Sequence, residues 1–362
     1  MTFTLPQAGD RLANLSTPQP VIDEDRLAAN IARVQSYMDA HGLAFRPHIK
    51  THKIPAVAMA QRQAGARGIN CQKISEAEVF ADAGFDDILI TFNILGADKL
   101  AALVALNARL GGLKVVADNA VTVDGLATAF AGSKPLTVLV ECDTGAGRCG
   151  VQTPAAALEL ALRIAASPAL RFGGLLTYPR AHGEAATEAF FAAALAALKA
   201  NGIACPIVSS GGTPSLFSAH LVPSATEHRA GTYVYNDRSM IRAGHCRLDD
   251  CAMHILATVV SRPTPDRAIL DAGSKALTSD LLGFTDFGLI VEYPDAAITS
   301  LSEEHATVDL ARVAGRRPEI GERLRIVPNH TCVVSNLFDR MVFHRAGVVT
   351  RVDAVAARGC VW

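Results

Sequence analysis

The sequence predicts an α/β chain with a (β/α)8 barrel of the TIM type followed by a mostly β C-terminal domain. Eight short β-type runs alternate with helical runs between about residues 20 and 235. Polar residues gather where these runs end, and barrel enzymes place their chemistry at that face. From about residue 245 onward, β-type runs follow one another without long helices between them. We therefore expect a barrel over residues 19–244 and a β-rich domain over residues 245–362.

The predicted barrel strands are short, and most are separated by segments in which Ala, Leu and Ile recur at helical spacing, such as 99–110 and 154–167. An open, doubly wound sheet is the alternative, but its usual glycine-rich turn after the first strand is missing. The strands are expected at residues 44–49, 68–72, 87–92, 113–118, 137–143, 172–178, 207–210 and 226–233.

The second domain is predicted from β-type runs alone. The segment before Pro18 precedes the first barrel helix, and chain termini of packed domains often lie close together. We therefore add the hypothesis that residues 1–18 pack with the second domain. The expected β-type runs span residues 253–260, 268–273, 288–293, 305–310, 323–328 and 341–352.

Composition narrows the class of partner. The chain has 34 basic and 35 acidic residues and no run of like charges, so it lacks the basic patch expected of a protein that binds nucleic acid or an anionic membrane. No apolar run reaches the roughly 18 residues of a membrane span. The eight cysteines show no CxxC spacing, which is typical of reduced, structural cysteines. A cytoplasmic protein acting on a small molecule is expected.

A basic cluster, RPHIKTHK, follows the first predicted strand at residues 46–53. Alternation along an extended strand would direct Arg46, His48, Lys50 and His52 to one face. Burying several cations in a barrel mouth costs free energy unless an anion, a metal or a covalent partner compensates them. A phosphorylated ligand and an imine formed by one lysine are both plausible answers. A solvated basic turn is the alternative.

A small glycine-rich turn, SSGGT, follows the seventh predicted strand. Barrels often bind phosphate after strands seven and eight, where backbone N–H groups can face the anion. By itself such a turn is more often a plain loop, and its position is what favours a phosphate site. The expected cradle consists of Ser209, Ser210, Gly211, Gly212 and Thr213, completed by Gly231, Thr232 and Tyr233.

Seven ordered motifs give the chain a family resemblance over nearly its whole length. They are TPQPVID at 17–23, RPHIKTHK, CQKISEAE at 71–78, ECDTGAGRCG at 141–150, SSGGT, DAGSKA at 271–276 and PNHTC at 328–332. With these motifs the chain resembles the D-threonine aldolase and D-serine dehydratase group, within the alanine-racemase-like fold of pyridoxal phosphate enzymes. The resemblance implies a homodimer that uses pyridoxal 5′-phosphate.

The resemblance also implies roles for single residues. The lysine that matches Lys50 carries the cofactor as an imine, and Lys53 does not. Arg148 matches an arginine beside the phenolic oxygen of the cofactor, and Tyr178 a tyrosine near its pyridine nitrogen. Gln72 matches a further residue on the cofactor side. Taken without the resemblance, a tyrosine at a strand end or an arginine between glycines would more often be packing or a turn.

His330 and Cys332 form the candidate metal pair. Standing two residues apart, they would face the same way on an extended strand and share one site. A packed histidine beside a buried cysteine is the alternative from spacing alone. The resemblance implies a divalent metal, Zn²⁺ or Mn²⁺, held by this pair, and the sulfur favours zinc.

The expected function is a lyase acting on D-3-hydroxy amino acids by retro-aldol cleavage, with glycine and an aldehyde as products. His182 is the candidate for the aldolase base, although its spacing from Tyr178 is shorter than the family pattern. The metal pair of this chain is His-x-Cys, whereas aldolases of the group carry His-x-Asp. This difference favours the alternative function, a dehydratase of D-serine or D-threo-3-hydroxyaspartate. In such a dehydratase Lys50 removes the α-proton. An amino-acid racemase and a non-catalytic cofactor carrier are further alternatives, and the large second domain argues against the carrier.

Overall fold

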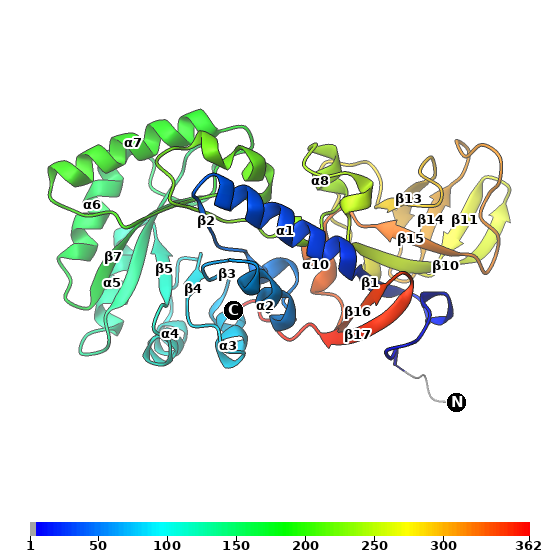
Figure 1. Cartoon of the computed structure of the whole chain (residues 1–362), viewed down its shortest axis with the longest axis horizontal. Coiled ribbons are helices and arrows are strands. Elements are labelled where there is room, and N and C mark those ends of the chain that lie inside the picture. Colours follow the sequence, from blue (N-terminus) through cyan, green and yellow to red (C-terminus); the bar gives the residue numbers. More distant parts are fainter. Residues whose placement is uncertain (1–4) are drawn as a thin grey trace. The chain divides into compact units, whose positions relative to one another are not determined.

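The structure is a computed structural model that describes residues 5–362, and its chain divides into two compact units (Figure 1). The barrel unit contains Arg33–Lys50, Val57–Gly231 and Cys360–Trp362. The β unit contains the chain up to Ala32 together with Thr51–Ala56 and Thr232–Gly359. The domain limits expected from the sequence, 19–244 and 245–362, refer to continuous stretches of chain and stay predictions.

The barrel unit is built on one sheet of eight parallel strands, in the spatial order β2-β9-β8-β7-β6-β5-β4-β3. Just after β2, His48 forms an isolated parallel bridge with Asn70 of β3, and the Asn70 N–H donates to Pro47 O at 2.9 Å, so the two end strands are joined. This confirms the predicted (β/α)8 barrel. The strands are Ala44–Phe45 (β2), Ile69–Cys71 (β3), Ile88–Ile90 (β4), Lys114–Ala117 (β5), Leu136–Cys142 (β6), Leu170–Thr177 (β7), Ile207–Ser210 (β8) and Glu227–His228 (β9).

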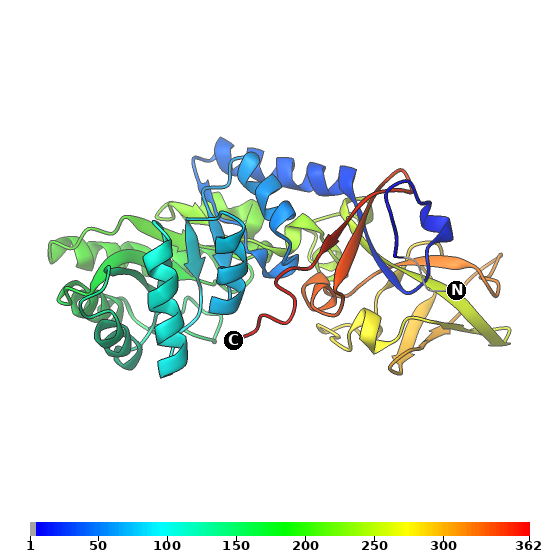
Figure 2. The same ribbon diagram turned by 90° about the horizontal axis from the view of Figure 1, so that it is seen from below.

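Helices pack on the outer face of this sheet, as Figures 1 and 2 show for α3 to α7. In α6 the Thr153 hydroxyl accepts from the Ala156 N–H at 3.1 Å, and Pro154 opens the first turn. Its buried side chains recur at helical spacing. The helices are Glu24–Ala40 (α1), Pro55–Gln63 (α2), Ile74–Asp82 (α3), Ala97–Arg109 (α4), Ala120–Ala129 (α5), Pro154–Ala165 (α6) and Glu184–Ala200 (α7).

The first and last barrel strands are shorter than predicted. After β2 the His48 N–H still donates to Ala230 O at 2.9 Å, and the chain then leaves the sheet in a 3-10 turn, Ile49–Thr51. After β9 the chain likewise turns at Thr232–Val234. In the middle of the sheet the predicted strands agree with the observed ones. These strands are buried, which gives each a clear apolar run, and four adjacent strands share one buried cluster: Leu89, Val116, Leu139 and Leu176.

The β unit contains a mixed sheet, and its β-rich character was predicted. The N-terminal strand β1 pairs antiparallel with β10 and parallel with β16, and Gly9 N–H donates to Val349 O of β17 at 2.8 Å. The strands are Gln19–Asp23 (β1), Met253–Thr264 (β10), Arg267–Leu270 (β11), Leu289–Ile290 (β12), Ala297–Leu301 (β13), Ala306–Asp309 (β14), Arg323–Val327 (β15), Arg340–Arg345 (β16) and Val348–Ala354 (β17). Short helices lie at Arg238–Arg242 (α8), Ser274–Leu277 (α9) and Thr331–Ser335 (α10).

Two details of the β unit differ from the sequence prediction. The run 341–352 is a hairpin of β16 and β17, and it turns at Ala346 and Gly347, which both have positive φ. The edge strand β13 was not predicted, because only one of its five side chains is buried and the apolar alternation is therefore weak. Across residues 5–362, no helix combines the length and apolar character needed to cross a membrane.

Candidate cofactor and metal sites

Two lysines of the basic cluster differ in what holds their amines. The Lys53 ammonium is buried in the β unit, where Nζ donates to Asn336 Oδ1 at 3.1 Å. The Lys50 side chain is half-buried at the end of the barrel-unit segment that carries β2, and within residues 5–362 its Nζ has no hydrogen-bond or ion-pair partner. Lys50 is therefore the lysine with an available amine.

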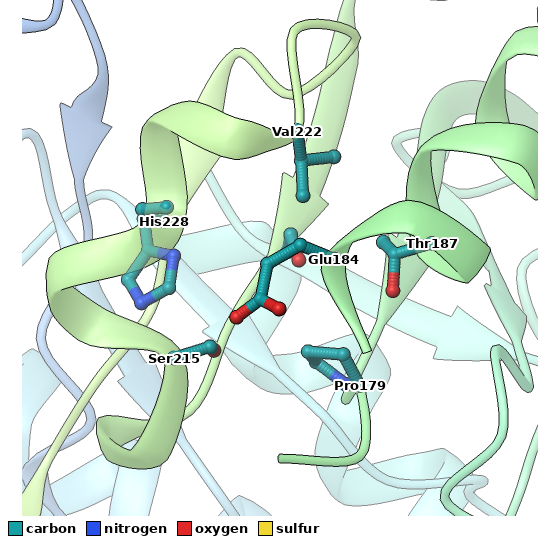
Figure 3. A pocket seen from close by; sticks show the side chains of 8 residues that line it. Pro179, Glu184, Thr187, Ser215, Val222 and His228 are labelled. Carbon is teal, nitrogen blue, oxygen red and sulfur yellow. The ribbon is translucent and has the colours of Figure 1, made fainter. Parts of the chain in front are cut away.

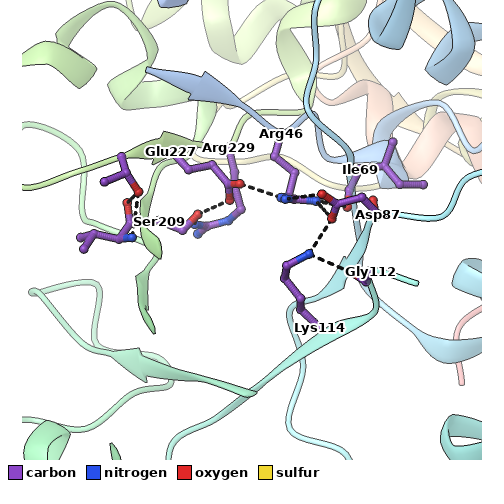
Figure 4. A network of polar contacts seen from close by, with 10 residues as sticks. Arg46, Ile69, Asp87, Gly112, Lys114, Ser209, Glu227 and Arg229 are labelled. Carbon is purple, nitrogen blue, oxygen red and sulfur yellow. Dashed lines mark hydrogen bonds and ion pairs between the residues drawn. The ribbon is translucent and has the colours of Figure 1, made fainter. Parts of the chain in front are cut away.

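The expected row of cations is wrong for Arg46. Its side chain is 1% exposed, and Nε donates to Glu227 Oε2 at 2.9 Å while NH1 donates to Asp87 Oδ1 at 2.7 Å (Figure 4). Lys114 Nζ also contacts Asp87, at 2.8 Å. Burial alone would raise the pKa of Asp87, but Arg46 and Lys114 hold it below its ordinary value. The charge of Arg46 is thus compensated by carboxylates of the protein, not by a ligand.

Ser209 also differs from the prediction. Its hydroxyl donates to Glu227 Oε1 at 2.6 Å and accepts from Arg229 NH1 at 2.6 Å, so it belongs to this buried network and does not face a phosphate (Figure 4). Arg229 NH2 donates in turn to Thr177 O at 2.7 Å, and burial lowers the pKa of Arg229 to about 10. The network therefore ties the ends of β7, β8 and β9 together beneath the glycine-rich turn.

The turn Ser210–Thr213 brings three of the predicted residues together. Gly211 has φ of +131°, and a Cβ there would lie 2.5 Å from Arg229 O, so only glycine fits. A Cβ on Gly212 would lie 2.8 Å from a ring carbon of Tyr178, which places that ring against the turn. The Arg148 guanidinium lies 4.6 Å from the centroid of the same ring. Tyr178 therefore lies in contact with both the glycine turn and Arg148.

Beside this turn lies a small pocket, which Figure 3 shows between the 3-10 segment Thr213–Leu221 and the start of α7. Ser210 lines it together with Glu184 and His228. In Figure 3 the Glu184 side chain lies between His228 on one side and Pro179 and Thr187 on the other. Within the described residues, His228 Nε2 has no hydrogen-bond partner, and burial lowers the pKa of this imidazole to about 3. The turn is thus backed by a neutral histidine, not by a further cation.

Gln72 is fixed by two hydrogen bonds. Its Nε2 donates to Thr91 O at 3.0 Å, which leaves Oε1 as the acceptor for His48 Nε2 at 3.0 Å. Burial and then the charge of Lys50 lower the pKa of His48 well below its ordinary value. His48 is therefore a neutral imidazole that carries its proton on Nε2.

The remaining predicted residues lie at the ends of barrel segments or in a loop. Gly231 is the last residue of the barrel-unit segment Val57–Gly231. Thr232 and Tyr233 are buried in the 3-10 turn that follows, which belongs to the β unit. Thr213 is buried at the start of the turn that follows Gly212. His182 is exposed in the loop before α7, with φ of +57°, and its ring has no polar partner among residues 5–362.

The metal pair is close together, but not for the predicted reason. His330 has extended backbone angles, whereas Cys332 lies in the first turn of α10 and not on a strand. At the start of this helix, Asp237 Oδ2 accepts from the Thr331 N–H at 3.2 Å, which satisfies a donor that a helix start leaves open. The two side chains still hydrogen bond each other, and burial, which lowers the pKa of His330, is outweighed by Cys332 and Asp237, which raise it to about 11.

The surroundings of this pair suit a metal with few protein ligands. Cys332 Sγ lies 3.2 Å from Thr51 Oγ1, the residue after Lys50 in the chain, and 3.9 Å from Thr232 Oγ1. Within residues 5–362 no three His, Cys, Asp or Glu side chains are grouped to hold a metal ion. An imidazole and a sulfur are donors that zinc accepts, and a catalytic zinc leaves positions open to water or substrate. The residues present therefore fit an open site better than a closed structural one.

Three residues of these sites were missed from the sequence. Arg229 and Glu227 lie within a predicted strand, but alternation did not reveal that they pair with Ser209 and Arg46. Asp237 follows an apolar stretch and begins α8, so its sequence signal is that of a helix cap. Its contact with His330 joins residues far apart in the chain, and no local pattern indicates it.

Comparison with known proteins agrees with this architecture. Residues 22–239 match the family model described as alanine racemase, N-terminal domain, and residues 252–344 match the putative serine dehydratase domain. The chain is 38% identical to a D-threonine aldolase of Arthrobacter sp., over 98% of this chain and 95% of that protein. It is 36% identical to a D-threo-3-hydroxyaspartate dehydratase of Delftia sp. (strain HT23), over 91% of this chain and 94% of that protein. The crystal structure of D-threonine aldolase from Filomicrobium marinum superposes with a TM-score of 0.91 at 31% identity, covering 99% of this chain and 100% of the other.

Proposed function

We propose that this chain, which belongs to the alanine-racemase-like family whose second domain is of the serine dehydratase type, is a pyridoxal phosphate-dependent lyase. Its proposed reaction is retro-aldol cleavage of a D-3-hydroxy amino acid to glycine and an aldehyde. The observation that carries the proposal is the Lys50 amine, which has no partner among residues 5–362, in a barrel that also has a glycine turn. The chain is similar over 98% of its length to a D-threonine aldolase.

The barrel unit fits pyridoxal phosphate. Once bound, this cofactor supplies an electron sink for the charge left when a bond to the substrate α-carbon breaks. We propose that Lys50 attaches it and that Tyr178, Arg148 and Gln72 orient its ring. We propose that the glycine turn holds the phosphate: a Cβ on Gly211 would lie 2.5 Å from Arg229 O and one on Gly212 2.8 Å from the Tyr178 ring, so the turn keeps a backbone without side chains, as phosphate loops do. The proposed phosphate ligands are Ser210, Gly211, Gly212, Thr213, Gly231, Thr232 and Tyr233.

His330 and Cys332 are the proposed ligands of a divalent metal. Thiolate and imidazole together favour Zn²⁺ over Mn²⁺. A metal at this pair would supply Lewis-acid polarisation of the substrate 3-hydroxyl. His182 remains the proposed base that takes the hydroxyl proton in the aldolase reaction, and its exposed loop position leaves its ring free to contact substrate.

A dehydratase is the second candidate, because Cys332 stands where aldolases of the group carry an aspartate. In that reaction Lys50 would remove the α-proton of D-serine or D-threo-3-hydroxyaspartate, and the products would be a 2-oxo acid and ammonia. For either reaction we propose a cytoplasmic homodimer whose partner is a small-molecule substrate, and the balance of 34 basic against 35 acidic residues supports a protein that binds neither nucleic acid nor membranes.

The two reactions are separated by their products. The purified protein, loaded with cofactor and Zn²⁺ or Mn²⁺, is incubated with D-threonine, D-serine and D-threo-3-hydroxyaspartate, and amino acids, aldehydes, oxo acids and ammonia are quantified. We expect glycine and an aldehyde without ammonia. Ammonia with a 2-oxo acid would identify the dehydratase, and conversion of D-alanine to L-alanine without metal would refute both lyases in favour of a racemase.

A further inference from the structure

Asp237 is a fully buried carboxylate surrounded by donors. Its side chain is 0% exposed, and Oδ2 lies 2.9 Å from His330 Nδ1 and 3.2 Å from the Thr331 amide nitrogen. The other oxygen, Oδ1, accepts from Ser239 Oγ at 2.6 Å and from the Met240 N–H at 3.1 Å. Two of these donors come from its own helix start and two from the segment that carries the metal pair. Asp237 is therefore shared between two elements.

The segment around Asp237 is fixed to the segment around His330 by further bonds. The Arg238 N–H donates to Pro328 O at 3.1 Å, and the Ser239 N–H donates to Asn329 O at 3.3 Å. The Arg238 guanidinium holds Asn329 Oδ1 at 3.2 Å and forms an ion pair with Asp286 at 2.6 Å. These bonds hold the Asp237 carboxylate in a fixed position. The His330 imidazole, which donates to it, is therefore oriented by the carboxylate.

The arrangement of donors decides the form of His330. An ionised carboxylate only accepts hydrogen bonds, so the His330 nitrogen that faces Asp237 Oδ2 must carry a proton. That nitrogen is Nδ1. A metal binds only the nitrogen that has lost its proton, and with Nδ1 donating to Asp237 that nitrogen is Nε2. The same side chain hydrogen bonds Cys332, so the imidazole and the sulfur are held side by side.

We infer that Asp237 is the positioning residue of the metal pair: it holds His330 through Nδ1 so that Nε2 and the Cys332 sulfur are presented together to a divalent metal. This inference rests on the metal site of the proposed function and adds to it a residue outside the ligand pair. Histidines that bind metals commonly donate their other N–H to a carboxylate, and loss of such a partner costs about 10- to 100-fold in metal affinity.

The test uses the full-length, cofactor-loaded protein with Co²⁺ as the probe, because a Co²⁺–thiolate bond has its own absorbance band. Unaltered protein, Asp237→Asn and Asp237→Ala are titrated with Co²⁺ and with Zn²⁺ in competition with a chelator. We expect about 10-fold weaker binding for Asp237→Asn, whose amide can still accept one bond, and up to about 100-fold for Asp237→Ala.

Asp286→Asn is the matched control. It removes a carboxylate from the same network, because Asp286 pairs with Arg238, but it does not touch His330. Its Co²⁺ affinity is expected to stay within about twofold of the unaltered protein, since the ligand shell is unchanged. Equal losses in Asp286→Asn and Asp237→Asn would overturn the inference, because the effect would then come from general loosening of the segment.

A second measurement does not depend on a folded variant. In Zn²⁺-loaded unaltered protein labelled with ¹⁵N-histidine, the His330 resonance should show a protonated Nδ1 and a metal-bound Nε2. Zinc on Nδ1 would overturn the inference. If the unaltered protein takes up no Co²⁺ or Zn²⁺ at all, the metal part of the proposed function fails together with the inference. If it binds metal and Asp237→Ala binds equally well, only the inference fails.

Discussion

Gly212→Ala tests whether Tyr178 faces the cofactor. The φ of Gly212 is −178°, which any residue can adopt, so the substitution adds a methyl group without backbone strain. That methyl carbon would lie 2.8 Å from Cε2 of Tyr178. Carbon atoms pack at about 3.5 Å or more, so the ring edge must withdraw by about 0.7 Å.

The ring has room to withdraw. Tyr178 is 39% exposed, and its ring also carries the Arg148 guanidinium, which must move with it. We therefore expect the protein to remain folded and the ring end of the cofactor site to be displaced. A displacement approaching 1 Å can lower turnover by about 100-fold. We expect about 10-fold weaker cofactor binding, which corresponds to about 1.4 kcal/mol.

Cofactor affinity is measured by absorbance titration of the cofactor-free protein, and turnover is measured with D-threonine. Gly147→Ala is the control. Gly147 lies in the loop that carries Arg148, and among residues 5–362 no atom lies within 4 Å of its added Cβ, although its φ of +67° adds strain. Unchanged cofactor affinity and turnover in Gly212→Ala, with a folded protein, would refute the placement of Tyr178 at the cofactor.

Four further predictions test other parts of the two sites. Lys50→Ala should abolish covalent attachment of the cofactor and its absorbance band, whereas Lys53→Ala should keep both, since its amine is held by Asn336; the reverse result would contradict the assignment. Chelation should abolish lyase turnover and leave cofactor absorbance intact, and loss of the cofactor would indicate a structural metal instead. His182→Ala should slow cleavage far more than it weakens cofactor binding, and an unchanged rate would exclude His182 as the base. Glu227→Gln should lower the thermal unfolding midpoint, because removing one partner of a buried ion pair costs about 3–5 kcal/mol. Asp87→Asn should lower it less, because the Asp87 side chain is 29% exposed. Equal shifts of the midpoint in the two variants would argue against the buried network.

Much of the fold could be predicted because its signals are local. The strands from β3 to β8 are apolar runs followed by polar residues, and each is close to its predicted position. The prediction failed where a turn ended a run. The 3-10 turn Ile49–Thr51 follows His48, so strand alternation does not extend to Lys50 and His52. That alternation placed Arg46 with Lys50, although Arg46 is buried beside Glu227.

The two lysines of the basic cluster show which part of a site sequence can supply. A motif narrows the attachment residue to Lys50 or Lys53, but spacing does not tell which amine is available. In the structure, the intervening 3-10 turn and the positive φ of Lys53 separate them, and Lys53 reaches Asn336, a residue 283 positions away. Availability is thus decided by a partner that lies in another part of the chain.

The metal pair likewise depends on a residue that is distant in the chain. The spacing of His330 and Cys332 predicted a shared site through strand alternation, and the pair is close although no strand is present. Asp237, 93 residues before His330, accepts from the Thr331 N–H at the start of α10 and holds the imidazole with the same oxygen. A motif can therefore be correct for a reason other than the one its pattern suggests. Substitution of Asp237 tests this contact directly, because the orientation of the His330 imidazole is expected to depend on it.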